Sequence, residues 1–376
     1  MFLAVRELVF ARTRFLLMGA VIALISILMV IMAGLSSGLV NDGVSGLQRT
    51  PAQAFAFAEG TKSDSAFSRS VVTEEQAQAW RERPDVANAA LFGNMIVNAK
   101  TQNGTPVDLT LFGIEPGSFL EPAAAEGTAL SGENTVIVSN TARDEGVNLG
   151  DTVTVDRLGT DLTVVGFTSD QRTFGHVDVA YVPLSTWQQI HAGTKAGEAP
   201  RADAYNEGSV IAIQGVDGAL PDLSAGDAAA GTASKTLTES FESSPGYSAE
   251  MMTMTMIKAF LYAISALVVG AFFTIWTVQR SREIAVMRAM GASTGFLLRD
   301  GLMQAVIVLV ASVLTGVAVG LGLGSLLTGS GMPFALEAGP VVSGAALLTV
   351  LGLAGAVVAI ARISSVDPLA ALGENR

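Results

Sequence analysis

Residues 15–40 read FLLMGAVIALISILMVIMAGLSSGLV, an unbroken run without a charged side chain. At a rise of about 1.5 Å per residue, a helix over this run crosses about 30 Å of hydrocarbon. A helix is the expected form because lipid offers no hydrogen-bond partner to an unpaired peptide group. A cleavable signal sequence has a shorter apolar core, and residues 39–42 make a poor cleavage site. The run therefore predicts a retained transmembrane helix.

Composition agrees with a membrane protein. Half of the 376 residues are hydrophobic and 15% are charged, against about 25% in soluble domains. Three further runs, residues 259–279, 301–328 and 340–361, bring the predicted membrane helices to four. The net charge of −12 argues against nucleic acid as a partner. The absence of cysteine excludes a disulfide framework, a thiolate metal site and a thiol nucleophile.

Basic residues flank the predicted helices on one side of the membrane. They are Arg6, Arg12, Arg14, Arg280, Arg282, Arg288, Arg299, Arg362 and Arg376. The turn at residues 329–339 has none and carries Glu337. Because basic flanks stay on the cytoplasmic side, both termini and the 280–300 loop are predicted to be cytoplasmic, and residues 41–250 to lie outside.

These boundaries give the predicted order of parts. They are a cytoplasmic amphipathic helix (1–14), a first transmembrane helix (15–40), an extracellular α+β domain (41–250), a stalk with the second transmembrane helix (251–279), a cytoplasmic coupling loop (280–300), a third helix (301–328), an outer turn (329–339), a fourth helix (340–361) and a cytoplasmic tail (362–376). The N-terminal helix is interpreted as an anchor whose arginines meet anionic lipid.

The long segment between the first two membrane helices has a different pattern. Alternation over residues 91–100 and 107–114, around Asn103-Gly104, predicts a β-hairpin. Further strands are predicted at 135–139, 152–156, 162–167, 177–182 and 209–214, and helices at 71–83, 140–147 and 183–190. The Gly/Ala/Ser-rich residues 215–233 are predicted to be a flexible loop. The fold class is thus a four-helix membrane protein with an extracellular α+β domain inserted between helices 1 and 2.

No catalytic constellation stands out in the sequence. His176 and His191 have no HExxH context and are interpreted as surface or packing residues. A GxSxG elbow is missing, and so is the GxxxxGK[ST] loop with which a chain binds ATP. The chain is therefore predicted not to be an enzyme.

The 280–300 loop is the most informative cytoplasmic stretch. Residues 279–293 read QRSREIAVMRAMGAS, which predicts a short helix ended by Gly291 at its C′ position. Ile284, Met287, Arg288 and Gly291 follow helical spacing. Such an element can dock into a groove of a soluble partner or lie among lipid headgroups, and physical arguments alone do not choose between the two.

This loop resembles the coupling element of permeases in the FtsX/MacB-like superfamily of ABC transporters. The family pattern R-x-x-E-I-x-x-x-[RK]-A-x-G-A-[ST] is matched by Arg280, Glu283, Ile284, Arg288, Ala289, Gly291, Ala292 and Ser293. The tail at residues 364–372 resembles the terminal D-P-x-x-A-L motif of the family. Residues 147–155, 162–167 and 181–187 resemble strands of its outer domain. The likeness covers nearly the whole chain.

The resemblance implies a non-catalytic permease subunit in the plasma membrane. Two copies of the permease would pair as a homodimer and bind two copies of a separate ATPase subunit. ATP would be bound only by that partner subunit. The residues expected to couple to the ATPase are Arg280, Arg282, Glu283, Ile284, Met287, Arg288 and Gly291. ATP binding would move the coupling helices and, through the first two membrane helices, the outer domains, a mechanism called mechanotransmission.

Within the superfamily, length and the compact outer domain most resemble heme-efflux permeases of the HrtB type in Gram-positive bacteria. Permeases that handle lipoproteins or antimicrobial peptides, and FtsX-like regulators of cell-wall hydrolases, stay open as alternatives. Heme would be a transported substrate, with no covalently bound cofactor and no metal held by the protein itself.

A cluster at the outer end of the second helix fits a metal-bearing, apolar ligand. Its residues are Tyr247, Glu250, Met251, Met252, Met254 and Met256, with Met29 and Met32 of the first helix at a similar depth. Phenolate, thioether and carboxylate groups are all ligands of iron. The alternative is that the methionines fill a dimer interface.

Glycines recur at helical spacing in the last two membrane helices. Gly316, Gly320 and Gly324 lie at i, i+4 and i+8, a pattern that lets helix backbones approach closely. Gly344, Gly352 and Gly355 are candidates on the fourth helix. Packing inside one subunit is favoured over a role in transport.

Overall fold

The computed structural model describes residues 12–279, 284–287, 290–328 and 332–361. The chain forms two compact units. The membrane unit comprises residues 1–39 and 251–376, and the outer unit comprises Val40–Glu250. The predicted cytoplasmic tail and most of the predicted N-terminal helix lie outside the described residues.

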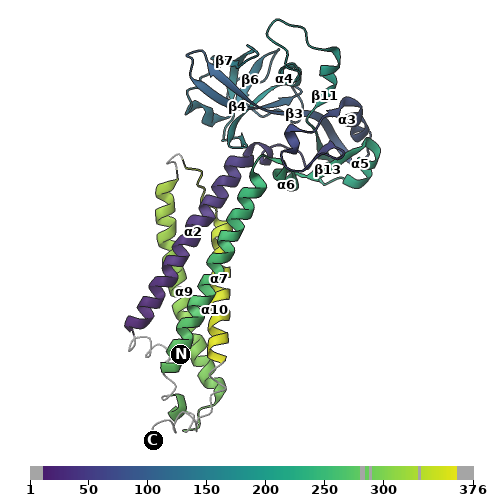
Figure 1. Cartoon of the computed structure of the whole chain (residues 1–376). Coiled ribbons are helices and arrows are strands. Elements are labelled where there is room, and N and C mark those ends of the chain that lie inside the picture. The colour runs from purple at the N-terminus through teal and green to yellow at the C-terminus, as the bar shows by residue number, and fades with distance from the viewer. Residues whose placement is uncertain (1–11, 280–283, 288–289, 329–331, 362–376) are drawn as a thin grey trace. The chain divides into compact units, whose positions relative to one another are not determined.

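Four helices among the described residues are long and apolar enough to cross a membrane (Figure 1). They are α2 (Arg12–Gln48), α7 (Tyr247–Gln279), α9 (Thr294–Leu327) and α10 (Ala338–Ala361). The predicted number of spanning helices is confirmed. The helices are longer than the apolar runs from which they were predicted, because polar residues continue them. In α2, for example, Asn41 and Asp42 extend the helix beyond the run at residues 15–40.

Small residues let these helices pack closely. A Cβ built on Gly316 would lie 2.4 Å from the carbonyl oxygen of Ala23, and one on Gly320 would lie 2.8 Å from Val30 Cβ. A Cβ on Gly355 would likewise lie 2.4 Å from the Ala266 carbonyl oxygen. The predicted packing role of these glycines is confirmed, since any side chain there would separate α9 from α2, or α10 from α7.

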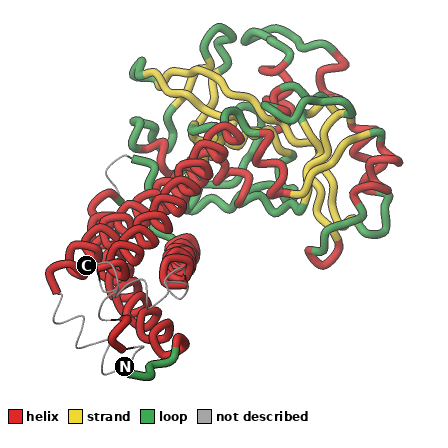
Figure 2. The backbone as a smooth tube through the Cα atoms, turned by 60° about the horizontal axis from the view of Figure 1, so that its bottom comes forward, coloured by secondary structure: helices red, strands yellow, loops and turns green. Residues whose placement is uncertain are grey.

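The outer unit is built on a mixed sheet with short helices and loops around it (Figure 2). Its strands run in the order β13-β1-β12-β3-β4-β10-β6-β8-β5, with β7 on β3 and β8, and β9 on β10. Their bounds are β1 Ala54–Ala58, β3 Val86–Thr101, β4 Pro106–Ile114, β5 Glu126–Gly127, β6 Thr135–Val138, β7 Thr152–Val155, β8 Asp161–Phe167, β9 Thr173–Phe174, β10 Val177–Pro183, β12 Val210–Gly215 and β13 Thr232–Thr236. A separate pair joins β2 (Val72–Thr73) to β11 (Glu207–Gly208).

Strand β3 links two halves of this sheet. Its first half pairs with β12 and its second half with β4 and β7, so its 16 residues take part in both. The five side chains that form a closed ring of aromatic contacts in the core, edge-to-face except for the tilted Phe55–Phe92 pair, are Phe55, Phe67, Phe92, Phe112 and Phe174. The helices of the unit are α3 (Glu74–Arg81), α4 (Leu184–His191), α5 (Leu223–Ala230) and α6 (Leu237–Ser240).

Most predicted elements of the outer unit are present. The β3–β4 hairpin is confirmed, and Gly104 at its turn has a φ of 77°. The predicted helix at 140–147 is shorter, a 3-10 turn over Asn140–Arg143. The predicted flexible loop at 215–233 is wrong: it contains α5, whose start is capped by Asp222 accepting a hydrogen bond from Ala225 N, and whose end is Gly231 at φ 64°.

Candidate functional site

The last turns of α2 are part of the core of the outer unit. Val44 and Leu47 are 0% exposed and pack with Phe112 and Phe174. A Cβ on Gly46 would lie 2.8 Å from Val179 Cγ2, so the helix lies directly on strand β10. This end of the helix is fixed by apolar contacts that any tilt would open.

A polar network adds to this attachment. Ser45 Oγ lies 2.9 Å from Thr173 Oγ1 and accepts a hydrogen bond from Thr173 N at 2.9 Å. Gln171 Nε2 donates to Asp42 at 3.1 Å, and Arg49 pairs with Asp170. The network ties one face of α2 to the segment that enters strand β9.

His176 lies between two carboxylates. It occupies the turn between β9 and β10, and its Nδ1 lies 2.8 Å from Asp42 Oδ2. Its Nε2 lies 3.1 Å from Glu250 Oε1, in the first turn of α7. A neutral imidazole has one N–H and can donate to only one of these acceptors, whereas the imidazolium donates to both. The geometry therefore fits the protonated ring.

The electrostatics of His176 agree with that geometry. Partial burial lowers the pKa of the imidazole, but the hydrogen bond to Asp42 and the charges of Glu250 and Asp42 outweigh it, so the pKa is raised above its usual value of 6.5. The side chain is 34% exposed. The cluster is consequently a charge-assisted link that loses strength when the ring deprotonates.

The interpretation of His176 as a surface or packing residue stands, since the side chain is about one-third exposed, and the structure adds that the ring bonds both carboxylates. The same interpretation is correct for His191, whose ring stacks on Trp187 at 4.6 Å between centroids. Sequence spacing gave no signal for the cluster, since Asp42, His176 and Glu250 are brought together only by the fold. The two carboxylates lie at opposite nitrogens of one ring, and the described residues hold no group of His, Asp and Glu arranged to chelate a metal.

The predicted ligand residues divide between the two units. Tyr247 and Glu250 belong to the outer unit, where the Tyr247 ring lies 6.2 Å from that of Phe241 and Glu250 bonds His176. Met251 and Met254 are half-buried in the membrane unit, while Met252 is 67% exposed. The exposed thioethers follow one face of α7.

Met29 has a different environment within the membrane unit. It is 2% exposed, and its sulfur would lie 2.6 Å from a Cβ on Gly344, beside the Tyr262 hydroxyl. In the described structure it fills the space between α2 and α10. Met32, one turn further, is half-buried.

A lysine near the outer part of α7 was not singled out from the sequence. Lys258 Nζ donates to Ser36 Oγ of α2 at 3.2 Å, and the two side chains lie within the membrane unit. A cation within a spanning helix is costly unless it has a partner, and such residues mark functional sites by default. Its signal in the sequence was a lone lysine directly before the uncharged run at residues 259–279.

The described part of the coupling loop has the predicted helix end. Residues 284–287 are helical, Ile284 and Met287 are half-buried, and Gly291 has a φ of 96°. Ala292 N donates to Met287 O at 2.9 Å, the bond of a Schellman C-cap. Arg280, Arg282, Glu283 and Arg288 lie outside the described residues.

Comparison with known proteins identifies the family to which this chain belongs. The family described as MacB-like periplasmic core domain matches residues 15–229, and the FtsX-like permease C-terminal family matches residues 250–368. The putative hemin transport system permease protein HrtB of Staphylococcus haemolyticus is 23% identical over 372 residues, 99% of each chain. An uncharacterized ABC transporter permease of Mycobacterium tuberculosis is 26% identical over 266 residues, 71% of this chain and 69% of the relative.

A solved structure, the extracellular domain of the noncanonic ABC-type transporter YknZ, is 16% identical with a TM-score of 0.34, covering 49% of this chain and 98% of that one. The two family matches lie on either side of the boundary between the outer domain and α7, in the order that the predicted inserted domain requires. The chain is a membrane protein and belongs to the MacB/FtsX-type permeases of ABC transporters.

Proposed function

We propose that this chain is the permease subunit of an exporter that removes hemin from the membrane, powered by a separate ATPase. The observation that carries the proposal is the likeness to hemin transport permeases over 99% of both chains. A match of that length includes the outer domain and all four spanning helices. In this proposal both termini and the 280–300 loop face the cytoplasm, and the predicted domain boundaries hold.

The geometry supports mechanotransmission. Helix α7 has 33 residues, about 50 Å at 1.5 Å per residue, against about 30 Å of hydrocarbon. Helix α2 is interrupted at Val44, whose φ of −145° and ψ of 15° are not helical, so its continuous part, residues 12–43, is about 48 Å long. Each is long enough to pass through the bilayer and reach into the outer domain as a lever. A ligand or an ATPase that binds two positions of such a lever with different affinity shifts its equilibrium.

The ATPase would dock on the coupling loop, in two copies for a permease dimer. The docking residues are proposed to be Arg280, Arg282, Glu283, Ile284, Met287, Arg288 and Gly291. The support is the Schellman end at Gly291, which gives the short helix a defined stop before α9 begins at Thr294.

The second permease copy would lie on α7. Exposed apolar side chains follow one face of this helix in the membrane unit: Met252, Met256, Phe260, Ile264 and Leu267. Their spacing of three or four residues makes one continuous stripe. A stripe of this kind faces either lipid or a second copy of the permease. The dimeric form expected for the family favours the second copy.

Hemin would be held near the outer end of α7, by Tyr247, Glu250, Met251, Met252 and Met254. Hemin carries carboxylates as well as iron. Lys258, which donates to Ser36 Oγ and lies on the same helix, would supply a cation for a hemin carboxylate. Met29 would contribute apolar packing, since its thioether is enclosed between α2 and α10.

The test of the substrate is ATPase stimulation in the reconstituted complex. Hemin, a lipoprotein and a peptide antibiotic are added separately to proteoliposomes that contain the permease and its ATPase. We expect stimulation by hemin alone. Stimulation by one of the other two compounds, with none by hemin, would reassign the substrate to that class.

The test of the ligand residues is the Soret band of hemin bound to the purified complex. Tyr247→Phe and Glu250→Ala are expected to shift the band or weaken binding, and Lys258→Met to weaken binding without a spectral shift. Ser248→Ala, at an exposed neighbouring position, is the matched control. Spectra and affinities equal to wild type in all three variants exclude the site.

A further inference from the structure

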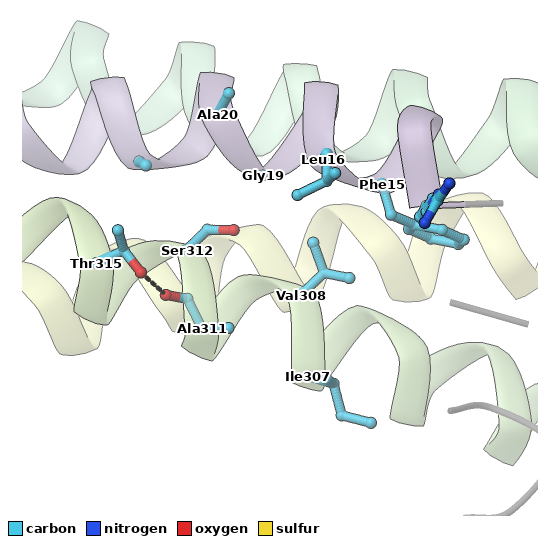
Figure 3. A pocket seen from close by; sticks show the side chains of 11 residues that line it. Phe15, Leu16, Gly19, Ala20, Ile307, Val308, Ala311, Ser312 and Thr315 are labelled. Atoms are coloured by element: carbon cyan, nitrogen blue, oxygen red, sulfur yellow. Dashed lines mark hydrogen bonds between the residues drawn. The ribbon is translucent and has the colours of Figure 1, made fainter. Parts of the chain in front are cut away.

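A groove runs along the seam between α2 and α9 in the membrane unit, at the end where α2 begins (Figure 3). Its volume is about 570 Å³, within the range of ligand pockets. It is lined by Arg12, Phe15, Leu16, Gly19, Ala20, Ala23, Ile307, Val308, Ala311, Ser312 and Thr315. Both walls therefore come from one unit, and no residue proposed for hemin or for ATPase docking takes part.

Small side chains open this groove. Gly19 and Ser312 meet at the seam, where a Cβ on Gly19 would lie 2.8 Å from Ser312 Oγ. Beside them, Ala20, Ala311 and Thr315 are exposed and too short to close the gap. The Thr315 hydroxyl donates to Ala311 O at 2.8 Å, so the side chain adds little polarity to the wall. In a bilayer such a depression is filled by lipid or by another helix.

The charge of the lining favours one occupant. Arg12 is the only charged residue among those that line the groove, and it lies at the end where the described part of α2 begins. Within the described ranges of the chain no carboxylate forms a salt bridge with Arg12. A guanidinium binds a phosphate in a planar, bidentate manner, so the charge of Arg12 suits a phosphate group.

The length of the groove matches one leaflet. From Arg12 to Ala23 a helix rises about 16 Å, and half of a hydrocarbon core of about 30 Å is about 15 Å. An acyl chain lying against Leu16, Ala20 and Ala23 would therefore extend from the headgroup level to the bilayer midplane. We propose that this groove binds an anionic phospholipid, with its phosphate at Arg12 and one acyl chain along the α2–α9 seam.

Native mass spectrometry of the full chain with its ATPase tests this proposal, using mixed micelles of phosphatidylglycerol and phosphatidylcholine. We expect Arg12→Gln to reduce bound phosphatidylglycerol about fivefold, the contribution of one basic residue beside an anionic membrane. Arg14→Gln is the matched control, because it removes the same charge two residues away, and Arg14 bonds Gln279 instead of lining the groove. Equal loss in both variants, or no loss in either, overturns the proposal.

Filling the groove tests the acyl-chain part separately. Ala311→Phe places an aromatic ring in the groove from an exposed position while Arg12 is kept. We expect this variant to lose the phosphatidylglycerol that the wild-type protein retains. Leu314→Phe, on the exposed face of the same helix outside the groove, should retain it. A photoreactive benzoylphenylalanine at position 311 should yield a lipid adduct; a cross-link to a second permease copy would show that a helix fills the groove and overturn the proposal.

Discussion

The outer ends of α2 and α7 are attached to the outer domain by different chemistry. The last turns of α2 are enclosed: Val44, Ser45 and Leu47 have no exposed surface, and polar bonds reinforce them. The first turn of α7 lies at the surface, follows Gly246 at φ 78°, and joins Asp42 of α2 through His176 and Glu250. The end of α2 is thus enclosed in the outer unit, whereas the start of α7 carries an ionic link that responds to protonation. We expect substitutions at the enclosed end of α2 to cost more stability than substitutions at the link to α7.

The largest effect is expected in the enclosed end. Leu47→Ala removes a fully buried side chain and leaves a cavity, so the free energy of unfolding of the outer domain should fall by about 2–5 kcal/mol. Thermal unfolding of the full chain, followed by fluorescence of the buried Trp80 and Trp187, measures this. Leu149→Ala, at a 45% exposed position, should change stability by less than about 0.5 kcal/mol. A similar loss in both variants would mean that the end of α2 is not enclosed.

The buried polar contact comes next. Ser45→Ala leaves the N–H of Thr173 without its acceptor, and an unsatisfied buried donor costs about 1–3 kcal/mol. The same unfolding measurement applies. Ser248→Ala makes the same chemical change at an exposed position on α7 and should be neutral. If the two serines behave alike, the comparison between the helix ends fails.

The link at α7 should depend on pH. The pKa of His176 is raised, so its stabilisation is present below about pH 6.5 and is lost as pH rises through the raised value. Because the ring is about one-third exposed, the effect should not exceed about 1 kcal/mol. His176→Gln should therefore destabilise the chain at pH 6 more than at pH 8.5, measured by the midpoint of thermal unfolding.

His191 provides the control of opposite sign. Burial lowers its pKa, so the stabilisation by the neutral ring is lost as pH falls below about 6.5. The difference between wild type and His191→Gln should thus shrink at acid pH. A profile for His176→Gln that follows the His191 trend would exclude a protonated link.

The smallest effect is expected for the ion pair between Arg49 and Asp170. Both side chains are about one-third exposed, and such pairs contribute about 0–1 kcal/mol. Arg49→Met should lower the unfolding midpoint slightly at low salt and not at high salt, where exposed charges are screened. A loss that persists at high salt would show that the alkyl stem of Arg49, not its charge, stabilises this end.

The four candidate spanning helices were predictable from the sequence because hydropathy is a local property. Four uncharged runs predicted four helices, and glycine spacing predicted a closely packed face on α9, which the structure shows to lie against α2. Turn chemistry at Asn103-Gly104 likewise located the β3–β4 hairpin. The helix α5 was missed because an Ala- and Gly-rich stretch has a weak apolar pattern, although Asp222 and Gly231 are ordinary caps.

The candidate site was harder to predict because its members are far apart in the chain. Asp42, His176 and Glu250 come from α2, a β-turn and α7, and no spacing rule connects them. Tyr247 and the methionines were singled out by residue type, which does not reveal that Met29 is enclosed while Met252 is exposed. The environment of a side chain depends on tertiary packing. A sequence pattern predicts that environment only when a single helix or strand supplies the whole site.

The turn that contains His176 places this residue in a backbone conformation that other residue types adopt more easily. Gly175 and His176 are two successive residues with positive φ, 61° and 64°, between the paired residues Phe174 and Val177. Asparagine or glycine suits both places of this two-residue hairpin better than an imidazole does. His176→Asn would therefore ease the backbone while removing the bonds to Asp42 and Glu250, so its effect on the free energy of unfolding would be the net of a gain and a loss.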